Sequence, residues 1–325
     1  MTAIIVLNWN GYQDTIDCLK SIYHIPSDFF VVVADNGSTD DSIPQIESFL
    51  HTSGIAYSIA QRGDCLKETP ISRSCFLLRN GQNLGFARGN NAALRFCGQY
   101  LPEHLLLLNN DTVVEADFLM RLETFIQAHP MYETLTPMIC YHKEKEKIWN
   151  CGGKQFWGFR KYYYANRYRS DVKETGHLDV TFLTGCALFC CSSLVKENGA
   201  LLSENFFFGE EDFNFCLNMN RQKRKMACVL DAVIYHKVSS STKKQDSIGK
   251  TYIYSLNRFI DIRQNSSSLF YLLWSHTYAI YVWLLLKRKG MTSAQAYRLQ
   301  KRIREEAARK ETVSLDDYLA AIGVK

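Results

Sequence analysis

The chain has 325 residues, of which 46% are hydrophobic and 13% aromatic, a composition that supports a large buried core and excludes a disordered protein. The net charge of +5 is uneven, because the segment from Ser241 onward holds 15 basic and 7 acidic residues, which predicts an anionic partner. The eleven cysteines lack the paired spacing of a zinc site, and no secretory signal is recognisable. We therefore expect free thiols in a reducing cytoplasm.

The first part of the chain alternates apolar runs of strand length with helix-like stretches. The predicted strands cover residues 3–7, 29–34, 76–78 and 105–108, and the predicted helices cover residues 15–23, 42–50, 87–97 and 116–128. This alternation indicates an α/β fold with a mostly parallel sheet and helices on both of its faces. In such sheets the ligand crevice lies beyond the carboxyl ends of the strands. Asn and Asp clusters occur at these ends, so we expect the functional site there.

The middle of the chain is less regular. Residues 61–73 are polar and predict an extended loop, while residues 143–173 show only weak periodicity. Further on, residues 180–190 predict a strand, residues 213–221 a helix and residues 227–235 a last strand.

The end of the chain has a different character. A run rich in Ser, Thr and Lys at 238–244 predicts the boundary between a catalytic domain, residues 1–240, and a basic helical region, residues 241–325. Residues 269–286 are mostly apolar but contain a polar triplet, which favours a helix lying in the membrane interface over a spanning helix. Residues 293–310 predict a charged helix. We expect this region to bind the membrane surface rather than nucleic acid.

Short motifs along the chain resemble, in their order, the family 2 glycosyltransferases, particularly the rhamnosyltransferase-like branch, over roughly residues 3–260. The matching segments are VLNWNG at 6–11, VADNGSTD at 33–40, NLGFARGNN at 83–91, LLLNND at 106–111, TG at 184–185, GEED at 209–212, and a His at 236 with serines behind it. The resemblance implies the GT-A fold of nucleotide-diphospho-sugar transferases. It also implies inversion at the anomeric carbon and a nucleoside-diphosphate-sugar donor.

The resemblance places the donor nucleotide at the ends of the first two predicted strands. Asp35 can accept hydrogen bonds from a nucleobase or ribose, and the resemblance assigns it to a uridine- or thymidine-type base. The alternative is a turn-forming Asp before the next helix. We expect Asn8 in the same pocket. Gly85 lets the backbone approach the diphosphate at a helix N-terminus, and Arg88 could add charge; the alternative there is a glycine turn with an exposed Arg.

A divalent metal, Mg²⁺ or Mn²⁺, is the predicted cofactor. Asn109, Asn110 and Asp111 take the place of the family's Asp-any-Asp motif, so only Asp111 brings a full charge. These ions prefer oxygen ligands and are commonly held by one or two carboxylates plus substrate phosphates. We therefore assign Asp111 to the metal and donor, Asn110 to the donor, and His236, by the family pattern, to the metal. The alternatives are a helix N-cap for Asp111 and a packed or surface role for His236.

Inverting transfer needs a carboxylate that takes the proton of the acceptor hydroxyl. The resemblance puts Asp212 in that role, with Glu211 as the second candidate because a shift of one residue would exchange them. Alternatively, both are acidic residues in the first turn of a helix. The three Phe residues just before them favour a strand that leads to the crevice. Thr184 and Gly185 are expected to line the acceptor pocket.

Together these features predict an inverting, metal-dependent glycosyltransferase that uses a UDP- or dTDP-sugar, with dTDP-rhamnose as one candidate. Its acceptor would be a saccharide or lipid-linked hydroxyl in cell-surface polysaccharide synthesis, at the inner face of the cell membrane. A nucleotidyltransferase is a rival, although the turn after the first strand has no basic residue. A non-catalytic nucleotide- or carbohydrate-binding module is another. A Rossmann dehydrogenase is disfavoured because GxGxxG is absent there.

Overall fold

A computed structural model describes residues 1–64, 69–198, 200–238 and 247–323. The strands are β1 (Thr2–Asn8), β2 (Phe29–Asp35), β3 (Tyr57–Gln61), β4 (Cys75–Arg79), β5 (His104–Asn109), β6 (Thr112–Val114), β7 (Tyr132–Tyr141), β8 (Ile148–Asn150), β9 (Gly153–Phe156), β10 (Phe159–Tyr162), β11 (His177–Val180), β12 (Ala187–Cys191) and β13 (Lys225–His236). The helices are α1 (Tyr12–Ile22), α2 (Ser42–Thr52), α3 (Gly85–Gly98), α4 (Phe118–Ala128), α5 (Ser193–Asn198), α6 (Glu211–Arg221), α7 (Ser247–Asn265), α8 (Ser268–Arg288), α9 (Ser293–Arg309), α10 (Leu315–Ala321) and the short 3-10 helix η1 (Arg169–Asp171).

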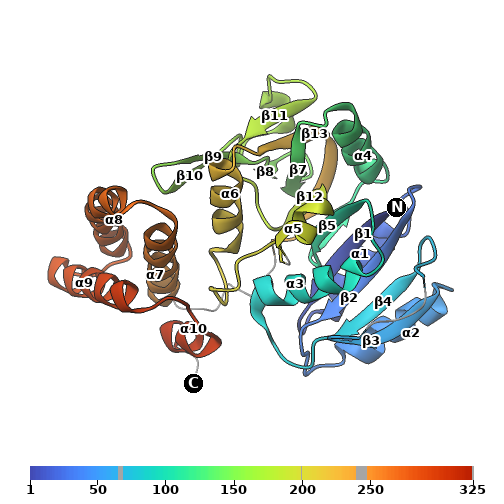
Figure 1. The fold of residues 1–325 in the computed structure, drawn as a ribbon, viewed down its shortest axis with the longest axis horizontal. Helices are drawn as coiled ribbons and strands as arrows, with labels where there is room; N and C mark the ends of the chain where they lie inside the picture. The colour runs from blue at the N-terminus through green and yellow to red at the C-terminus, as the bar shows by residue number, and fades with distance from the viewer. Residues whose placement is uncertain (65–68, 199, 239–246, 324–325) are drawn as a thin grey trace.

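One sheet dominates the fold, with the strand order β11-β13-β7-β12-β5-β1-β2-β4-β3 (Figure 1). From β5 to β3 all neighbouring strands are parallel, whereas β12 is antiparallel to both β5 and β7. In this register Asn8 lies opposite Asp35, and Leu7 lies opposite Asn109. The polar residues that follow the first, second and fourth predicted strands therefore meet at the carboxyl ends of the parallel strands. The predicted parallel α/β sheet is confirmed.

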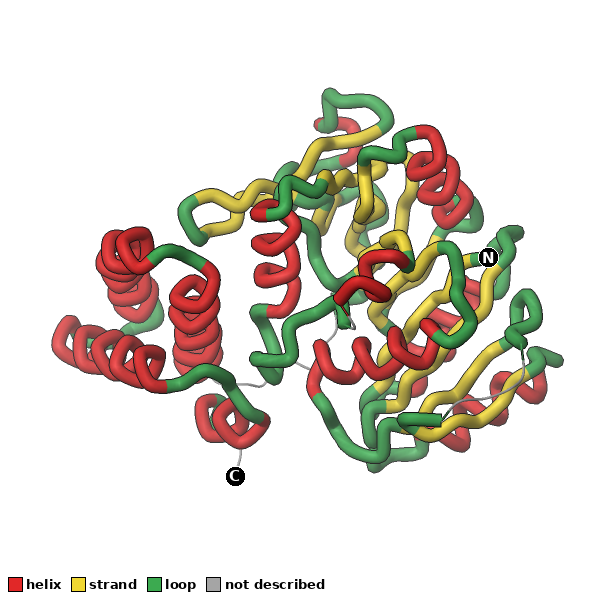
Figure 2. The backbone as a smooth tube through the Cα atoms, viewed as in Figure 1, coloured by secondary structure: helices red, strands yellow, loops and turns green. Residues whose placement is uncertain are grey.

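Helices cover both faces of the sheet, as Figure 2 shows in red around the yellow strands. The side chains of β1 alternate between the faces, so Ile4 and Val6 pack in one core with residues of α1, α2 and α4. Ala3 and Ile5 pack in the other core, with residues of α3 and α6. Each fully buried Ile stabilises the fold by about 1.5–3 kcal/mol. The apolar run at the start of the chain thus becomes a central strand because both of its faces are covered.

Two predicted strands are wrong in detail, and one strand was not anticipated. The strand predicted over residues 180–190 is two strands, β11 and β12, whose connection holds the Thr184–Gly185 segment. Strand β3 lies at the sheet edge, just before the segment predicted as a loop, and was not anticipated. Residues 206–208 form no strand beyond an isolated bridge. They are apolar because Phe206 is buried and the rings of Phe207 and Phe208 pack against Tyr318.

A short hairpin, β9–β10, packs with its turn against helix α8 of the C-terminal region. Its two-residue turn, Trp157–Gly158, has positive φ at both positions (49° and 69°), the geometry of a type I′ hairpin turn. A Cβ on Gly158 would collide with the Trp274 ring of α8, so this close approach requires glycine. Trp274 also donates a hydrogen bond from Nε1 to the carbonyl of Trp157 at 3.1 Å. The hairpin tip is therefore docked on α8.

The C-terminal helices α7, α8 and α9 pack together beside α6, shown in orange and red in Figure 1. The helices predicted at 269–286 and 293–310 are present as α8 and α9, whereas α7 was not predicted. Within the described ranges, α8 is the one helix long and apolar enough to cross a membrane, and about 33% of its most apolar window is buried in the protein. Most of the boundary predicted at 238–244 lies outside the described residues.

Candidate active site

The ends of β1 and β2 form a buried hydrogen-bonded turn. Asp35 is 1% exposed, and its carboxylate accepts hydrogen bonds from Asn8 Nδ2 (2.9 Å), Ser38 Oγ (2.6 Å) and the Ser38 amide (3.0 Å). The bond from the Ser38 amide is the turn-forming interaction that was the alternative for Asp35. It holds the carboxylate at the strand end beside Asn8. The assignment of both residues to a nucleotide base stays a prediction.

A second chain of hydrogen bonds ties the end of β5 to this turn. Thr15 donates from Oγ1 to Asn8 Oδ1 at 2.7 Å, and Asn110 donates from Nδ2 to Thr15 Oγ1 at 3.0 Å. The structure therefore brings Asn8, Asn110 and Asp35 into one connected cluster, as the donor assignment requires. Thr15 was missed by the sequence analysis, although it lies one helical turn after Gly11, at the start of α1.

Asp111 and His236 lie side by side although 125 residues separate them in the chain. The last residue of β13, His236, pairs with Thr112 of β6, directly after Asp111. This pairing sets His236 Nε2 3.0 Å from Asp111 Oδ1. The ring of Trp149 packs edge-on against the His236 ring, with 4.4 Å between the centroids. The sequence analysis predicted that these two residues act together, and the sheet topology provides the contact.

The two acidic residues proposed as bases both lie in the first turn of α6, as the alternative reading expected. Their environments differ. Glu211 is 5% exposed, and its Oε2 accepts hydrogen bonds from the amides of Gly209 (2.6 Å) and Glu210 (2.8 Å). Burial, with the Asp212 charge beside it, raises the pKa of Glu211 to about 7. Asp212 accepts a hydrogen bond from Arg160 at 3.3 Å.

Asp212 borders a cavity of about 620 Å³ at the carboxyl edge of the sheet. Thr184 and Gly185 line the same cavity, and an added Cβ on Gly185 would lie 3.9 Å from the Cβ of Asp212. Its walls are rich in aromatic and basic side chains, which come from β8, β10, α7 and α8: Trp149, Phe159, Arg160, Tyr162, Tyr254, Arg258, Tyr278 and Tyr281. The structure thus joins Asp212, Glu211 and the predicted acceptor residues in one cavity.

The sequence analysis did not indicate the cavity role of Arg160 in the hairpin, nor the residues that α7 and α8 contribute to this cavity. Arg160 lies in a segment with weak periodicity, and its side chain reaches Asp212 across 52 residues of sequence. Arg258 of α7 forms a buried ion pair with Glu210 and lies 3.4 Å above the centre of the Phe213 ring. Recognising Arg258 would have required the prediction of α7, the helix that carries it, and this helix was not predicted.

Two predicted donor residues have other contacts. Gly85 has a φ of +79°, and a Cβ there would collide with the main chain of Phe207. The glycine therefore allows α3 to approach this segment closely. Arg88 donates to the carbonyl of Glu204 from Nε (3.3 Å) and from Nη2 (3.1 Å), and it does not line the cavity. Their role in donor binding stays a prediction.

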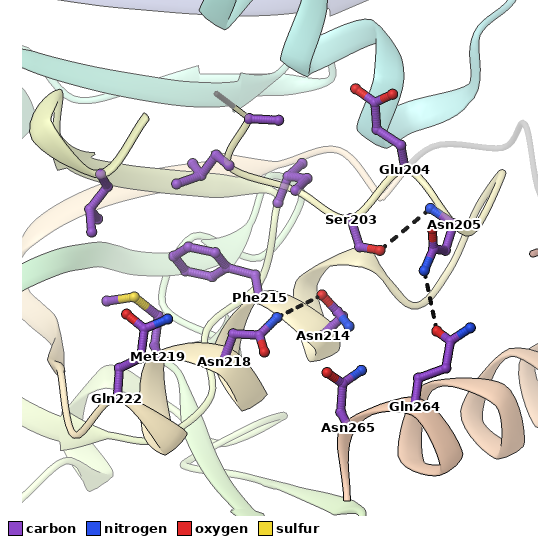
Figure 3. A pocket seen from close by; sticks show the side chains of 14 residues that line it. Ser203, Glu204, Asn205, Asn214, Phe215, Asn218, Met219, Gln222, Gln264 and Asn265 are labelled. Atoms are coloured by element: carbon purple, nitrogen blue, oxygen red, sulfur yellow. Dashed lines mark hydrogen bonds between the residues drawn. The ribbon is translucent and has the colours of Figure 1, made fainter. Parts of the chain in front are cut away.

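A second cavity, of about 630 Å³, contains none of the predicted site residues (Figure 3). It is lined by later residues of α6, the end of α7 and the segment before α6. Side-chain amides predominate among its polar groups, and Asn205 donates to Gln264 Oε1 there at 3.2 Å. Because Thr184, Gly185, Glu211 and Asp212 line the first cavity and no predicted site residue lines the second, we place the candidate active site in the first.

A sheet of this topology, with helices on both faces and a carboxylate at a cavity beyond its strand ends, has the architecture of the GT-A fold. Residues 2–248 match the family model described as "Glycosyltransferase like family 2". This match covers most of the chain, so the chain belongs to that family. A search of curated proteins finds no match.

Solved structures with this fold include glycosyltransferases. The mannosyltransferase PcManGT from Pyrobaculum calidifontis, in complex with GDP-Man and Mn²⁺, has a TM-score of 0.55 at 14% identity, over 99% of this chain and 79% of its own. GalNAc-T7 with UDP, GalNAc and Mn²⁺ has a TM-score of 0.59 at 12% identity, over 99% and 56%. TarS 1-349 from S. aureus has a TM-score of 0.53 at 16% identity, over 99% and 80%. These likenesses confirm the expected GT-A fold.

Proposed function

We propose that the chain is an inverting, metal-dependent glycosyltransferase that moves a sugar from a nucleoside-diphosphate donor to a hydroxyl of a saccharide or lipid-linked acceptor. The observation that carries this proposal is the placement of the Asp111–His236 pair and of Asp212 at the carboxyl end of the sheet. The Asp111–His236 pair lies at one place, and Asp212 borders the cavity. Trp149 connects them, because it contacts the His236 ring and also lines the cavity.

In this proposal Asp111 and His236 would hold one divalent ion. Asp111 Oδ1 and His236 Nε2 are separated by 3.0 Å. In the described part of the chain no group of three or more acidic, His or Cys side chains could hold a metal, so donor phosphates and water would supply the other ligands. Bound there, Mg²⁺ or Mn²⁺ would stabilise the charge that develops on the leaving diphosphate.

Asp212 is the proposed general base. As the acceptor oxygen forms its bond to the anomeric carbon, the hydroxyl proton passes to the Asp212 carboxylate. The bond from that carbon to the diphosphate oxygen breaks, and the nucleoside diphosphate leaves. Attack from the side opposite the leaving group inverts the configuration. Arg160 orients the Asp212 carboxylate, and the aromatic walls of the cavity suit the apolar faces of sugar rings.

For the donor we propose a UDP- or dTDP-sugar, bound with its base near Asn8 and Asp35. The resemblance to the rhamnosyltransferase-like branch makes dTDP-rhamnose a specific candidate. Two structures with the same fold contain GDP-Man or UDP, and both contain Mn²⁺, which supports a nucleotide donor and a divalent ion in this chain. Residues 1–240 would form the catalytic domain, and α7 and α8 of the C-terminal region would complete its cavity.

We also propose that the enzyme works in the cytoplasm, peripherally on the inner face of the cell membrane, in cell-surface polysaccharide synthesis. The excess of basic residues from Ser241 onward supports attachment of residues 241–325 to an anionic lipid surface.

A thermal-shift screen tests the proposed function. Ligands that bind only the folded state raise its melting temperature, and a ligand at 100 times its Kd stabilises by about 2.7 kcal/mol. We expect a UDP- or dTDP-sugar with MnCl₂ to raise the melting temperature by a few degrees, and EDTA to abolish the shift. A screen that includes GDP-mannose and finds no metal-dependent shift would contradict the proposal.

Product analysis separates the rival functions. A glycosyltransferase releases a nucleoside diphosphate from the sugar nucleotide when an acceptor is present. A nucleotidyltransferase would instead release pyrophosphate from a nucleoside triphosphate and a sugar phosphate. A non-catalytic module would show the thermal shift without turnover of either kind.

A further inference from the structure

Helix α8 presents an apolar face to solvent in the described part of the chain. Five side chains on this face are between 47% and 69% exposed: Leu269, Leu272, Leu273, Ile280 and Leu284. Their spacing of three, four and seven residues places them on one side of the helix, which we call the outer face. His276 is also exposed on this side. A row of exposed Leu and Ile side chains of this length marks a surface that binds an apolar partner.

The opposite side of α8 forms part of the candidate active site. Tyr278, Tyr281 and Leu285 line the cavity that Asp212 borders. Tyr281 is 42% exposed, so it lies at the cavity rim. One helix therefore separates the cavity from the outer face, and the diameter of a helix with its side chains is about 10–12 Å.

The packing of α8 favours a helix that lies on a membrane. Its inner residues pack against α7 and α9, and Trp274, Val282 and Leu286 are fully buried. The Trp274 ring also packs against Phe259 of α7 and bonds to the hairpin turn at Trp157. A spanning helix would be surrounded by lipid and would lose these contacts.

Basic residues flank the outer face. Lys287, Arg288 and Lys289 follow it at the C-terminal end of α8, and Arg288 and Lys289 are exposed. The chain from Ser241 onward has 15 basic and 7 acidic residues. An apolar helix face next to basic side chains is typical of helices that insert into the interface of an anionic bilayer.

We propose that the outer face of α8 docks on an anionic lipid bilayer, and that the acceptor is anchored in that bilayer. Docked in this way, α8 holds the cavity about one helix diameter above the lipid surface. An acceptor whose lipid part stays in the bilayer can then place its polar head, with the reacting hydroxyl, beside Asp212. The docking part deepens the membrane attachment proposed above and does not depend on transferase activity, whereas the acceptor part rests on the proposed transferase function.

Vesicle sedimentation of the full chain tests the docking part. Wild-type protein should sediment with phosphatidylcholine vesicles that contain phosphatidylglycerol, and bind pure phosphatidylcholine vesicles much more weakly. The double variant Leu273→Glu, Ile280→Glu should lose about tenfold or more in affinity, because two charges enter the docked face. Met120→Glu is the matched control, since Met120 is exposed on α4 (49%) and should leave binding unchanged.

The two parts of the proposal fail in different ways. Equal vesicle binding by wild type and the double variant would overturn the docking face. A membrane extraction experiment gives a second test: if detergent releases the protein from cell membranes but alkaline carbonate does not, the docking face is also overturned. The double variant should keep the wild-type thermal shift with the donor. A lost shift would indicate that the variant is unfolded. The milder variant Leu273→Ser, Ile280→Ser would then be tested, and we expect it to bind vesicles more weakly than wild type.

The acceptor part is tested with the labelled donor and membranes. Labelled sugar should enter products that extract into organic solvent, and the double variant should transfer several-fold less. Label found only in water-soluble products would overturn the bilayer-anchored acceptor while leaving the proposed transferase function in place. If no donor shifts the melting temperature, the proposed function fails, and vesicle binding still decides the docking face.

Discussion

The two acidic side chains that begin α6 differ in what their oxygens do. Glu211 bonds to two backbone amides at the start of its own helix, a role that stabilises the α6 N-terminus. Both residues line the cavity, but the Asp212 side chain is 19% exposed and pairs with Arg160, whereas Glu211 is only 5% exposed. A general base must reach the acceptor hydroxyl, so the geometry favours Asp212 over Glu211.

The buried Glu211 should leave a signature in the pH dependence of stability. Its pKa is raised to about 7 in the folded protein, above its value in the unfolded chain. The folded state therefore binds more protons, and this contribution to the free energy of unfolding falls as the pH rises from about 4.5 to about 7. We expect the difference between wild type and Glu211→Gln, measured by urea unfolding, to change by up to about 3 kcal/mol over this range. A pH-independent difference would contradict the raised pKa.

The metal assignment predicts a specific loss of nucleotide affinity. Asp111→Ala and His236→Ala should each weaken binding of UDP or dTDP at least about tenfold in calorimetry with Mn²⁺, because each removes one ligand. In EDTA the variants and wild type should bind equally. Asp117→Ala, which removes an exposed carboxylate paired with Arg121, is the control. Unchanged affinity in both site variants would remove Asp111 and His236 from the metal site.

At the scale of elements, contacts between α6 and α7 join the helix that carries the proposed base to the C-terminal region. Arg258 of α7 donates hydrogen bonds to both carboxylate oxygens of Glu210, the residue directly before α6. It also donates to the carbonyl of Gly158 in the hairpin turn. Asn214 of α6 bonds to the buried Asp261 of α7. The cavity wall and the first turn of α6 are thus held by one polar network.

Breaking this network should be costly. Arg258→Met leaves the Glu210 carboxylate buried without its cation, which costs about 3–5 kcal/mol in the free energy of unfolding. Adding Glu210→Gln should recover part of that loss, because the Glu210 charge is then no longer buried without its cation. Arg302→Met removes an exposed pair with Glu306 and should cost no more than about 1 kcal/mol. Equal effects of Arg258→Met and Arg302→Met in urea unfolding would show that the network is not structural.

The burial pattern of each element explains whether the sequence could predict it. Strand β1 was predicted because its apolar residues are buried on both faces, which leaves a continuous apolar run. Helix α7 was missed because Asn257, Arg258 and Asp261, all buried, interrupt its apolar periodicity. Strand β3 was missed because it lies at an edge and is partly exposed, so its pattern is weak.

At the scale of the molecule, the candidate site combines what motifs show with what only the fold shows. The strand-end positions of Asn8, Asp35 and Asp111 follow from apolar runs that stop at polar residues. The contact of Asp111 with His236 needs the β6–β13 pairing, which no local pattern encodes. The cavity needs the hairpin, α7 and α8, whose lining residues are far apart in sequence, from Phe159 to Leu285.

The most direct test of the account is the turnover of Asp212→Asn, measured as nucleoside diphosphate released with donor, acceptor membranes and Mn²⁺. The substitution keeps the shape of the side chain but removes the proton acceptor, so turnover should fall by about 10²–10⁴, with donor affinity almost unchanged. Glu211→Gln, measured in parallel, should be much milder. Near-normal turnover in Asp212→Asn would contradict the account. An inactive Glu211→Gln beside it would move the base to Glu211, and activity in both would leave the acidic pair as the first turn of a helix only.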